Sequence, residues 1–298
     1  MIRVISLASL VLLCAAARAD DVDDVVATVN GVALTGDDLR ISLALRGLPE
    51  QVSPTVRRQA VEWLIERELI RQFLQRNKST VDPEPLEAAV RRTVERLQRE
   101  KRPAEPSLES LGIDEARVAA EMAVPVAWRR HAARATTDQQ IRAHFEKHRR
   151  HFDGTRLRVS QIFRKYDQGE SIEDAPATTA ALNAIRTSIT RGTTTFAEAA
   201  RSSSQSPSAK NAGDVGWIDP QGDLPAAVSN AAFALKAGDV SDVILSPFGA
   251  HLVTVTDVKP GDLSLEDVRP EVQAELADAL WTETVAAERQ DAKIVVNE

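Results

Sequence analysis

The stretch that decides the fold is Gly213 to Val255, GDVGWIDPQGDLPAAVSNAAFALKAGDVSDVILSPFGAHLVTV. It opens with two glycines around a short apolar run, which is typical of a turn that enters a strand. AAFAL then predicts a helix with Phe233 turned inward, and the glycine at 238 marks its end. The closing FGAHLVTV alternates as a strand does, so its register places His251 on one face.

The residues on both sides of this stretch have a similar composition and similar strand and turn signals. Upstream, RLRVSQIF also alternates as a strand, and glycine, serine and β-branched residues become common after Asp153-Gly154. Downstream, Pro260-Gly261 is a strong turn signal. We therefore predict a mixed α+β domain over residues 154–260, with a small antiparallel sheet and surrounding helices.

The flanking sequence, by contrast, is mostly helical. It begins with a β-rich run at Val25–Val29, an Asn30-Gly31 turn and a candidate helix cap at Thr35. Apolar residues at helical spacing then predict four helices, which lie at 54–78, 83–101, 114–135 and 138–152. After the α+β domain, residues 261–298 hold one more helix and the short strand KIVV. A lone terminal helix has no core of its own, so we expect it to pack back on the N-terminal helical lobe, residues 20–153.

The first residues indicate export. Arg3 precedes an apolar run from Val4 to Ala17 that is too short to span a bilayer, which predicts a signal peptide over residues 1–19. Its cleavage would remove Cys14, the only cysteine, so disulfide chemistry is not expected. The formal net charge of −7 argues against nucleic acid as a partner. We expect no cofactor and no metal.

Four ordered motifs carry a resemblance to a known family. They are GDVGW, AAFAL, AGDVSDV and FGAHLVTV, and together they resemble the parvulin-type (PpiC-type) peptidyl-prolyl cis-trans isomerases, or rotamases. The helical flanks resemble the SurA and PrsA foldases, in which such a domain is inserted between an N-terminal helical lobe and a C-terminal helix. The resemblance implies a periplasmic foldase with unfolded or proline-containing polypeptides as clients.

The resemblance also implies a polar site, commonly two histidines, a cysteine or aspartate, and a serine or threonine. His251 matches the second histidine, whereas Gln161 stands where the first would be. Ser206 takes the place of the cysteine or aspartate and Ser246 that of the threonine. The implied substrate-contacting residues are apolar, namely Val215, Leu224, Val228, Phe233 and Phe248. We expect the site to be partly degenerate, and Gln161→His to raise the rate.

Prolyl isomerisation makes and breaks no covalent bond. The barrier of about 18–20 kcal/mol arises because amide resonance is lost when the bond twists. A thousandfold acceleration requires roughly 4 kcal/mol of selective stabilisation of the twisted imide. We therefore expect an isomerase that assists the folding of secreted or outer-membrane proteins, with activity weakened by the glutamine at position 161.

Alternatives of other classes remain open. The alternative to the isomerase is a non-catalytic periplasmic chaperone, or an assembly factor of a secretion apparatus, that uses the domain for binding. A hydrolase triad of Ser206, His251 and Asp214 lacks a nucleophile-elbow motif. His144, His148 and His151 have helical metal-ligand spacing, but neighbouring arginines favour a solvated basic face. Client identity, peripheral association with the envelope and oligomeric state are left undetermined.

Overall fold

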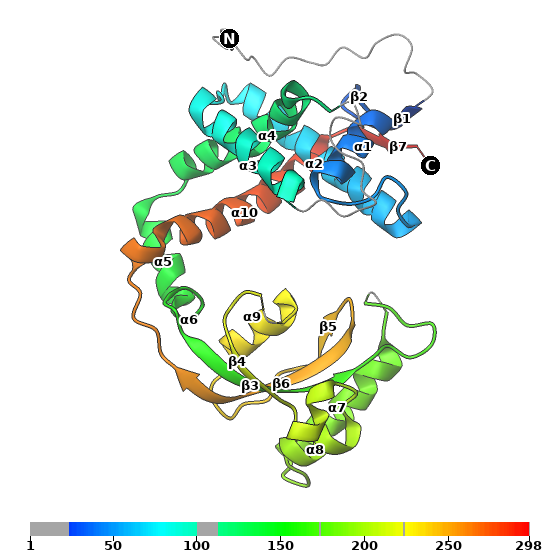
Figure 1. The fold of residues 1–298 in the computed structure, drawn as a ribbon, viewed down its shortest axis with the longest axis vertical. Helices are drawn as coiled ribbons and strands as arrows, with labels where there is room; N and C mark the ends of the chain where they lie inside the picture. Colours follow the sequence, from blue (N-terminus) through cyan, green and yellow to red (C-terminus); the bar gives the residue numbers. More distant parts are fainter. Residues whose placement is uncertain (1–23, 100–112, 173, 223, 298) are drawn as a thin grey trace. The chain divides into compact units, whose positions relative to one another are not determined.

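The computed structural model describes residues 24–99, 113–172, 174–222 and 224–297, and these form two compact units (Figure 1). Unit 1 holds the described residues up to Asp138 and those from Gln273 onward, and unit 2 holds Gln139–Val272. Unit 2 is thus inserted into unit 1 along the chain, as the sequence predicts. The predicted signal peptide lies outside the described residues.

Unit 2 begins 15 residues before and ends 12 residues after the predicted domain of residues 154–260, so the predicted boundaries at 153/154 and 260/261 differ from those of the structure. The helices α5 (Asp138–Lys147) and α6 (Arg149–Phe152) belong to unit 2, and they are separate helices rather than the single one expected. Arg150 on α6 donates from Nη1 to the carbonyl oxygen of Leu235 at 2.7 Å. Such contacts join these helices to the sheet domain, although their composition matches that of the helical lobe.

Unit 1 contains a three-stranded sheet in the order β2-β1-β7. β1 (Val25–Val29) and β2 (Val32–Thr35) form the predicted hairpin around Asn30 and Gly31, both of which have positive φ. Thr35 then caps α1 (Gly36–Leu45) in a reciprocal capping box with Asp38. The hairpin and the first helix are therefore one continuous local structure.

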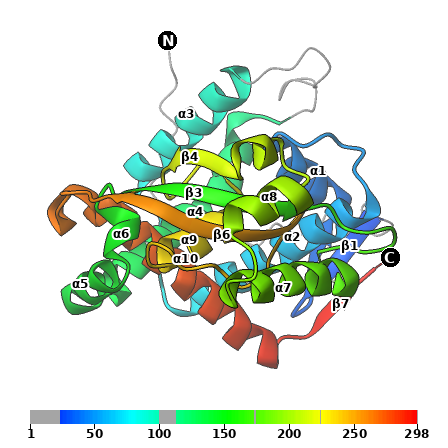
Figure 2. The same ribbon diagram turned by 90° about the horizontal axis from the view of Figure 1, so that it is seen from below.

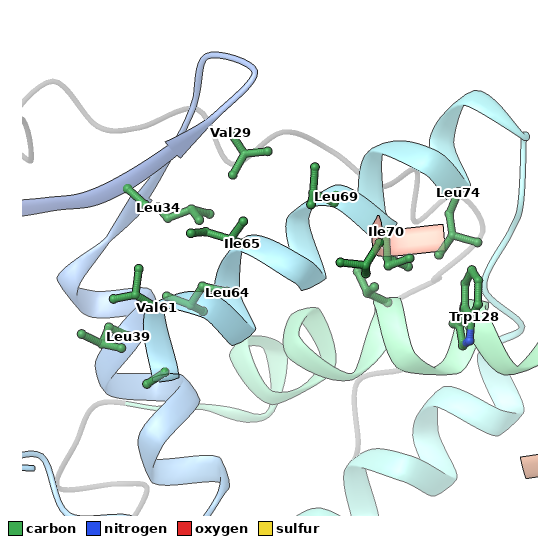
Figure 3. Packing of buried hydrophobic residues seen from close by; sticks show 14 of the residues in the cluster. Val29, Leu34, Leu39, Val61, Leu64, Ile65, Leu69, Ile70, Leu74 and Trp128 are labelled. Atoms are coloured by element: carbon green, nitrogen blue, oxygen red, sulfur yellow. The ribbon is translucent and has the colours of Figure 1, made fainter. Parts of the chain in front are cut away.

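Helices α2 (Pro54–Arg76), α3 (Pro83–Arg99) and α4 (Glu115–Ala135) follow, close to the predicted bounds. α4 continues through Pro125. One face of α2 is buried against the hairpin, α1 and α4, and Figure 3 shows Ile65 of α2 near Leu34 of β2 and Leu74 near Trp128 of α4. The apolar stripe of α2 thus supplies the centre of the core of unit 1.

From Gln273 onward, the last elements belong to unit 1. α10 (Leu265–Asp291) leads into β7 (Ile294–Val296), which pairs antiparallel with β1. The indole nitrogen of Trp128 donates to the carbonyl oxygen of Ala277 on α10 at 2.9 Å. The Trp128 ring also meets the ring of Trp281 edge-on, with 5.4 Å between centroids. Hydrogen bonding and ring packing therefore fix α10 against α4.

Unit 2 is built on a four-stranded antiparallel sheet in the order β4-β3-β6-β5. Its members are β3 (Arg156–Arg164), β4 (Asp214–Ile218), β5 (Ile244–Ser246) and β6 (Gly249–Lys259). Figure 2 shows β3 and β6 running side by side with β4 next to β3. β5 and β6 are joined by a tight turn, and this antiparallel sheet confirms the predicted fold class.

The two faces of this sheet are covered by different helices. On one face, α9 (Ala226–Ala234) packs against an apolar cluster that includes Val159 and Val253. On the other, α7 (Pro176–Thr190) and α8 (Phe196–Ser203) supply the residues packed around Ile162 and Leu252. Alternation along β3 places Gln161 on the face of Val159, the face that α9 covers in part.

Two absences apply only to the part of the chain that the structure describes. In those residues, no helix has both the length and the apolar character needed to cross a membrane. Nor do their histidine, cysteine, aspartate and glutamate side chains gather in groups of three that would suit a metal ion.

Candidate functional site

The polar residues predicted for the site lie together on one face of the sheet of unit 2. His251 on β6 and Gln161 on β3 are in direct contact, with His251 Nδ1 3.2 Å from Gln161 Oε1. The register of the two strands explains this contact. His251 lies opposite Phe163, and Phe163 is two residues after Gln161 on β3, so the three side chains are on the same face of the sheet. The two central strands therefore bring together residues that are far apart in sequence.

Gln161 extends the contact to a second segment. Its Nε2 donates to Ser206 Oγ at 3.3 Å, and Ser206 Oγ lies 3.0 Å from Ser208 Oγ. Ser206 caps a short 3-10 helix, η2 (Pro207–Asn211), that holds Ser208 at its start. The site thus continues beyond the predicted residues to a further hydroxyl.

On the other side, the imidazole of His251 meets the β5–β6 turn. His251 Nε2 is 2.8 Å from Ser246 Oγ, which also accepts from the backbone nitrogen of Phe248 at 3.2 Å. The hydroxyl of Tyr166, in the loop after β3, donates to the carbonyl oxygen of Ser246 at 2.6 Å. Ser246 is therefore held from both its backbone and its side chain.

His251 is deeply buried, with 4% of its surface exposed, and Ser246 is buried as well. Burial lowers the pKa of His251 from 6.5 to about 4, because the charged imidazolium would lose its hydration. The imidazole is consequently neutral at physiological pH. Together with an amide and three hydroxyl groups, it forms an uncharged polar chain, which we define as residues 161, 206, 208, 246 and 251.

A close backbone approach beside Gln161 depends on a glycine. Gly213 has a φ of +84° and its carbonyl oxygen accepts from the backbone nitrogen of Gln161 at 2.9 Å. A Cβ at position 213 would lie 2.6 Å from the carbonyl oxygen of Gln161. The first glycine of GDVGW is therefore required for η2 and β4 to reach β3 at the site.

The segment before η2 is joined to the end of β3. Gln205 donates from its backbone nitrogen to the carbonyl oxygen of Phe163 at 2.8 Å, and Ser204 Oγ accepts from the backbone nitrogen of Phe163 at 3.0 Å. These bonds align the segment with the strand, which holds Ser206 next to Gln161.

The predicted apolar contacts divide into two groups. Phe248 is 69% exposed next to Ser246, and Val215 and Leu224 are half-buried at the edge of the apolar cluster. Val228 has no exposed surface and Phe233 is buried, since both belong to the core between α9 and the sheet. Val228 and Phe233 would have to be uncovered before they could contact a substrate, and their role as substrate contacts stays a prediction.

The other predicted constellations are not assembled as catalytic or metal groups. Asp214 pairs with Arg158 at 2.6 Å, which lowers the pKa of its carboxyl group, and it is not a partner of His251. His144 and His148 have ring centroids 4.6 Å apart, and His151 meets the ring of Phe233. These histidines belong to the packing around α5 and α6.

The sequence reasoning missed two residues that contact the site. Ser208 lies two positions after Ser206, and a hydroxyl at that spacing is an ordinary partner for a helix-capping serine, which was the available signal. Tyr166 reaches Ser246 across 80 positions of sequence, so no local pattern could have indicated that contact.

Comparisons with known proteins show which family the domain in unit 2 is similar to. Residues 162–257 match the model of the rotamase family, described as the PPIC-type PPIASE domain. A "Chaperone SurA" of Dechloromonas aromatica is 42% identical over 100 residues, and a "Foldase protein PrsA" of Geobacillus sp. strain WCH70 is 36% identical over 119 residues. These regions cover 34% and 38% of this chain.

The likeness to these relatives is local. This chain spans 22% of the length of the SurA protein and 42% of that of the PrsA protein. Among solved structures, PrsA from Bacillus anthracis covers 76% of this chain with 18% identity and a TM-score of 0.42. That likeness is weak at the scale of the whole chain, so the domain match is the informative one.

Proposed function

Because residues 162–257 form a PPIC-type rotamase domain, we propose that this protein is a peptidyl-prolyl cis-trans isomerase that acts on unfolded polypeptides. The residues that would handle the X-Pro segment are Gln161, Ser206, Ser246 and His251, with Val215, Leu224 and Phe248 as its apolar surroundings. Gln161 precedes the first matched position by one residue and contacts the matched His251 directly.

The single observation that carries the proposal is that the polar chain is unbroken although the first family histidine is absent. A neutral histidine and a glutamine share one property, since each has an acceptor and a donor on the same planar group. Gln161 uses both, with Oε1 on His251 and Nε2 on Ser206. The replacement thus preserves the connectivity that a histidine would provide.

The uncharged character of the chain suits the chemistry. A planar imide owes part of its stability to a charge-separated resonance form, and the twisted transition state loses that form. Surroundings of low polarity therefore favour the twisted imide relative to the planar one. Val215, Leu224 and Phe248 provide apolar surroundings, and the neutral polar chain adds no ionised side chain to them.

A protease-coupled assay on a proline tetrapeptide tests the proposal. The wild-type chain is expected to accelerate cis-trans exchange above background, and His251→Ala to lose at least tenfold in kcat/KM, because both halves of the polar chain are then disconnected. Ser202→Ala is the matched control: its hydroxyl bonds to Ala199 within α8 and to Ser203, outside the chain. Equal rates for wild type and His251→Ala would contradict an isomerase site here.

The alternative is a non-catalytic chaperone in which the domain only binds clients. Its support is Phe248, an aromatic ring that is 69% exposed beside the polar chain and available to an apolar segment. In the described residues of unit 1, large apolar side chains are exposed at Val295 and Val296. Suppression of client aggregation without any acceleration of exchange would favour this alternative.

We further propose export to the periplasm and clients among secreted or outer-membrane proteins. The basis is the leader-like sequence of residues 1–19 and the local likeness to a chaperone and a foldase. Fractionation of cells that express the full chain tests the first part, with N-terminal sequencing expected to find Asp20 first. A chain recovered in the cytoplasm with its leader intact would contradict export.

A further inference from the structure

The contacts of His251 determine which of its ring nitrogens carries the proton. A neutral imidazole has one N–H, so it donates to one neighbour and accepts from the other. Its Nδ1 faces the amide oxygen of Gln161 at 3.2 Å, and an amide oxygen can only accept. Nδ1 must then be the donor, and Nε2 accepts from the Ser246 hydroxyl at 2.8 Å.

The donors and acceptors can be assigned in the same way for Ser206 and Ser208, which follow Gln161 in the polar chain. Its Nε2 can only donate, so Ser206 Oγ is the acceptor at 3.3 Å, and it also accepts from the backbone nitrogen of Ser208 at 3.3 Å. The one hydrogen of Ser206 is then directed to Ser208 Oγ at 3.0 Å. From Ser246 to Ser206, each side chain thus donates one hydrogen to the next side chain of the chain.

We propose that these groups form one directional chain, in which donation runs from Ser246 to His251, Gln161, Ser206 and Ser208. Gln161 and Ser208 are positioning residues that hold His251 as the tautomer protonated on Nδ1. In this direction the hydroxyl hydrogen of Ser208 and the second amide hydrogen of Gln161 are not donated within the chain, so the Ser208 hydroxyl can donate to a bound ligand. The inference deepens the proposed function, but the tautomer is a property of the protein without substrate.

Donation in the opposite direction, from Ser206 to Ser246, would also give each of these side chains a hydrogen-bond partner. The last residue of the polar chain, Ser208, therefore matters for the choice between the two directions. If the Gln161 amide turned over, Ser206 would donate to it, His251 would donate from Nε2, and the Ser246 hydroxyl would donate to the carbonyl oxygen of Gly249 at 3.1 Å. In the structure the amide oxygen of Gln161 faces His251 and its amide nitrogen faces Ser206, which is the arrangement of the proposed direction from Ser246 to Ser208, called the forward direction.

Ser208 decides between the two directions of donation, because its hydroxyl oxygen is the acceptor that the forward direction requires for the hydrogen of Ser206. Without its hydroxyl, the hydrogen of buried Ser206 loses its acceptor in the forward direction. In the reverse direction, Ser206 donates to Gln161 and still accepts from the backbone nitrogen of residue 208. Removing a hydroxyl that does not contact His251 should therefore change the protonation of its ring.

Long-range proton–nitrogen NMR on the ¹⁵N-labelled full chain at pH 7 tests this, with the His251 signals assigned by their loss in His251→Gln. The wild type is expected to show Nδ1 protonated, and Ser208→Ala to show Nε2 protonated as the major form. Ser202→Ala, a serine on α8 outside the chain, is the matched control and should keep the wild-type pattern. A wild type protonated mainly on Nε2, or an unchanged pattern in Ser208→Ala, would overturn the proposal.

A double variant provides the second arm. In Gln161→Glu with Ser208→Ala, the carboxylate can only accept, so turning it over brings no donor to His251. Nδ1 is expected to be protonated in this variant despite the missing serine hydroxyl, and an unprotonated Nδ1 would overturn the proposal. Isomerase rates play no part in either readout, so a failed rate assay and a failed tautomer prediction remain distinguishable.

Discussion

At the residue scale, the polar chain depends on a histidine whose charge is suppressed by burial. His251 lies under the β5–β6 turn with 4% of its surface exposed, and its ring also meets the ring of Phe163 with 4.9 Å between centroids. Neutrality is what allows the imidazole to accept from Ser246 while it donates to Gln161. The charge state of this residue is thus linked both to the site and to stability.

The first prediction concerns pH. The pKa of His251 is about 4 in the folded chain against about 6.5 when unfolded, so the unfolded state binds the proton first as pH falls. The contribution to stability is complete above pH 6.5, decreases as pH falls from 6.5 to 4, and is lost below that, up to about 3 kcal/mol. Urea unfolding of wild type and His251→Gln at several pH values should show their difference change over this window, and parallel curves would contradict it.

The second prediction concerns the two glycines of GDVGW. Gly213 and Gly216 both have positive φ, but only a Cβ at 213 would meet other atoms within 4 Å, namely the Gln161 backbone and Ala200 Cβ. Gly216→Ala should cost about 1–2 kcal/mol of folding free energy from backbone strain alone. Gly213→Ala should exceed it by at least about 1 kcal/mol, and thermal unfolding measures both. Equal losses would mean that the close approach is not needed.

Much of this site could be predicted from the sequence, because aligned motifs fix positions along strands. Gln161, Ser206, Ser246 and His251 lie in one chain, as the motif matches suggested. Their roles stay predictions. The depth of Val228 was not predictable, since a smaller apolar side chain on α9 can sink into the core where a larger one would remain in reach.

At the element scale, local signals predicted the helices and strands well. The hairpin turn, the Thr35 capping box and the bounds of α2 follow from residues close together in sequence. The break at His148 between α5 and α6 was missed, because the apolar spacing continues across it and no proline or glycine marks it. The packing of the folded chain decides where such a break occurs, and the spacing of apolar residues in the sequence does not report that packing.

The third prediction tests how α10 is attached to α4. Trp128→Phe removes the hydrogen bond to the Ala277 carbonyl and reduces the ring contact with Trp281. We expect a loss of about 2 kcal/mol in the free energy of unfolding, measured by urea denaturation. Trp217→Phe is the matched control, since Trp217 is 37% exposed on the edge strand β4 and should change stability by less than about 0.5 kcal/mol. Similar losses in both would refute the anchoring role.

At the scale of the whole molecule, the chain is two units that are interleaved in sequence. The sequence predicted the insertion but misplaced its ends, because composition changes where the strands begin, whereas the unit begins at Gln139. The ends of the inserted sheet are close in space, since Arg156 pairs with Lys259 and Leu263 donates to the Asp153 carbonyl. Hydrogen bonds between its own backbone atoms therefore join the two ends of the sheet region of unit 2.

The fourth prediction follows from this closure. Every residue of the polar chain and every apolar residue proposed to contact substrate belongs to unit 2. The excised segment Gln139–Val272 should keep kcat/KM for a proline tetrapeptide within about threefold of the full chain, since a short substrate needs only these groups. Aggregation assays with a long unfolded client provide the comparison for unit 1. A rate tenfold lower in the excised segment would show that unit 1 contributes to the site.

The pairing of β7 with β1 has a consequence for a chain that emerges with its N-terminus first, whether from the ribosome or from an export channel. Unit 2 has all its residues once position 272 has emerged, whereas the sheet of unit 1 waits for residues 294–296. Unit 2 would then finish folding first, while the helices that precede it in the chain still await their final strand.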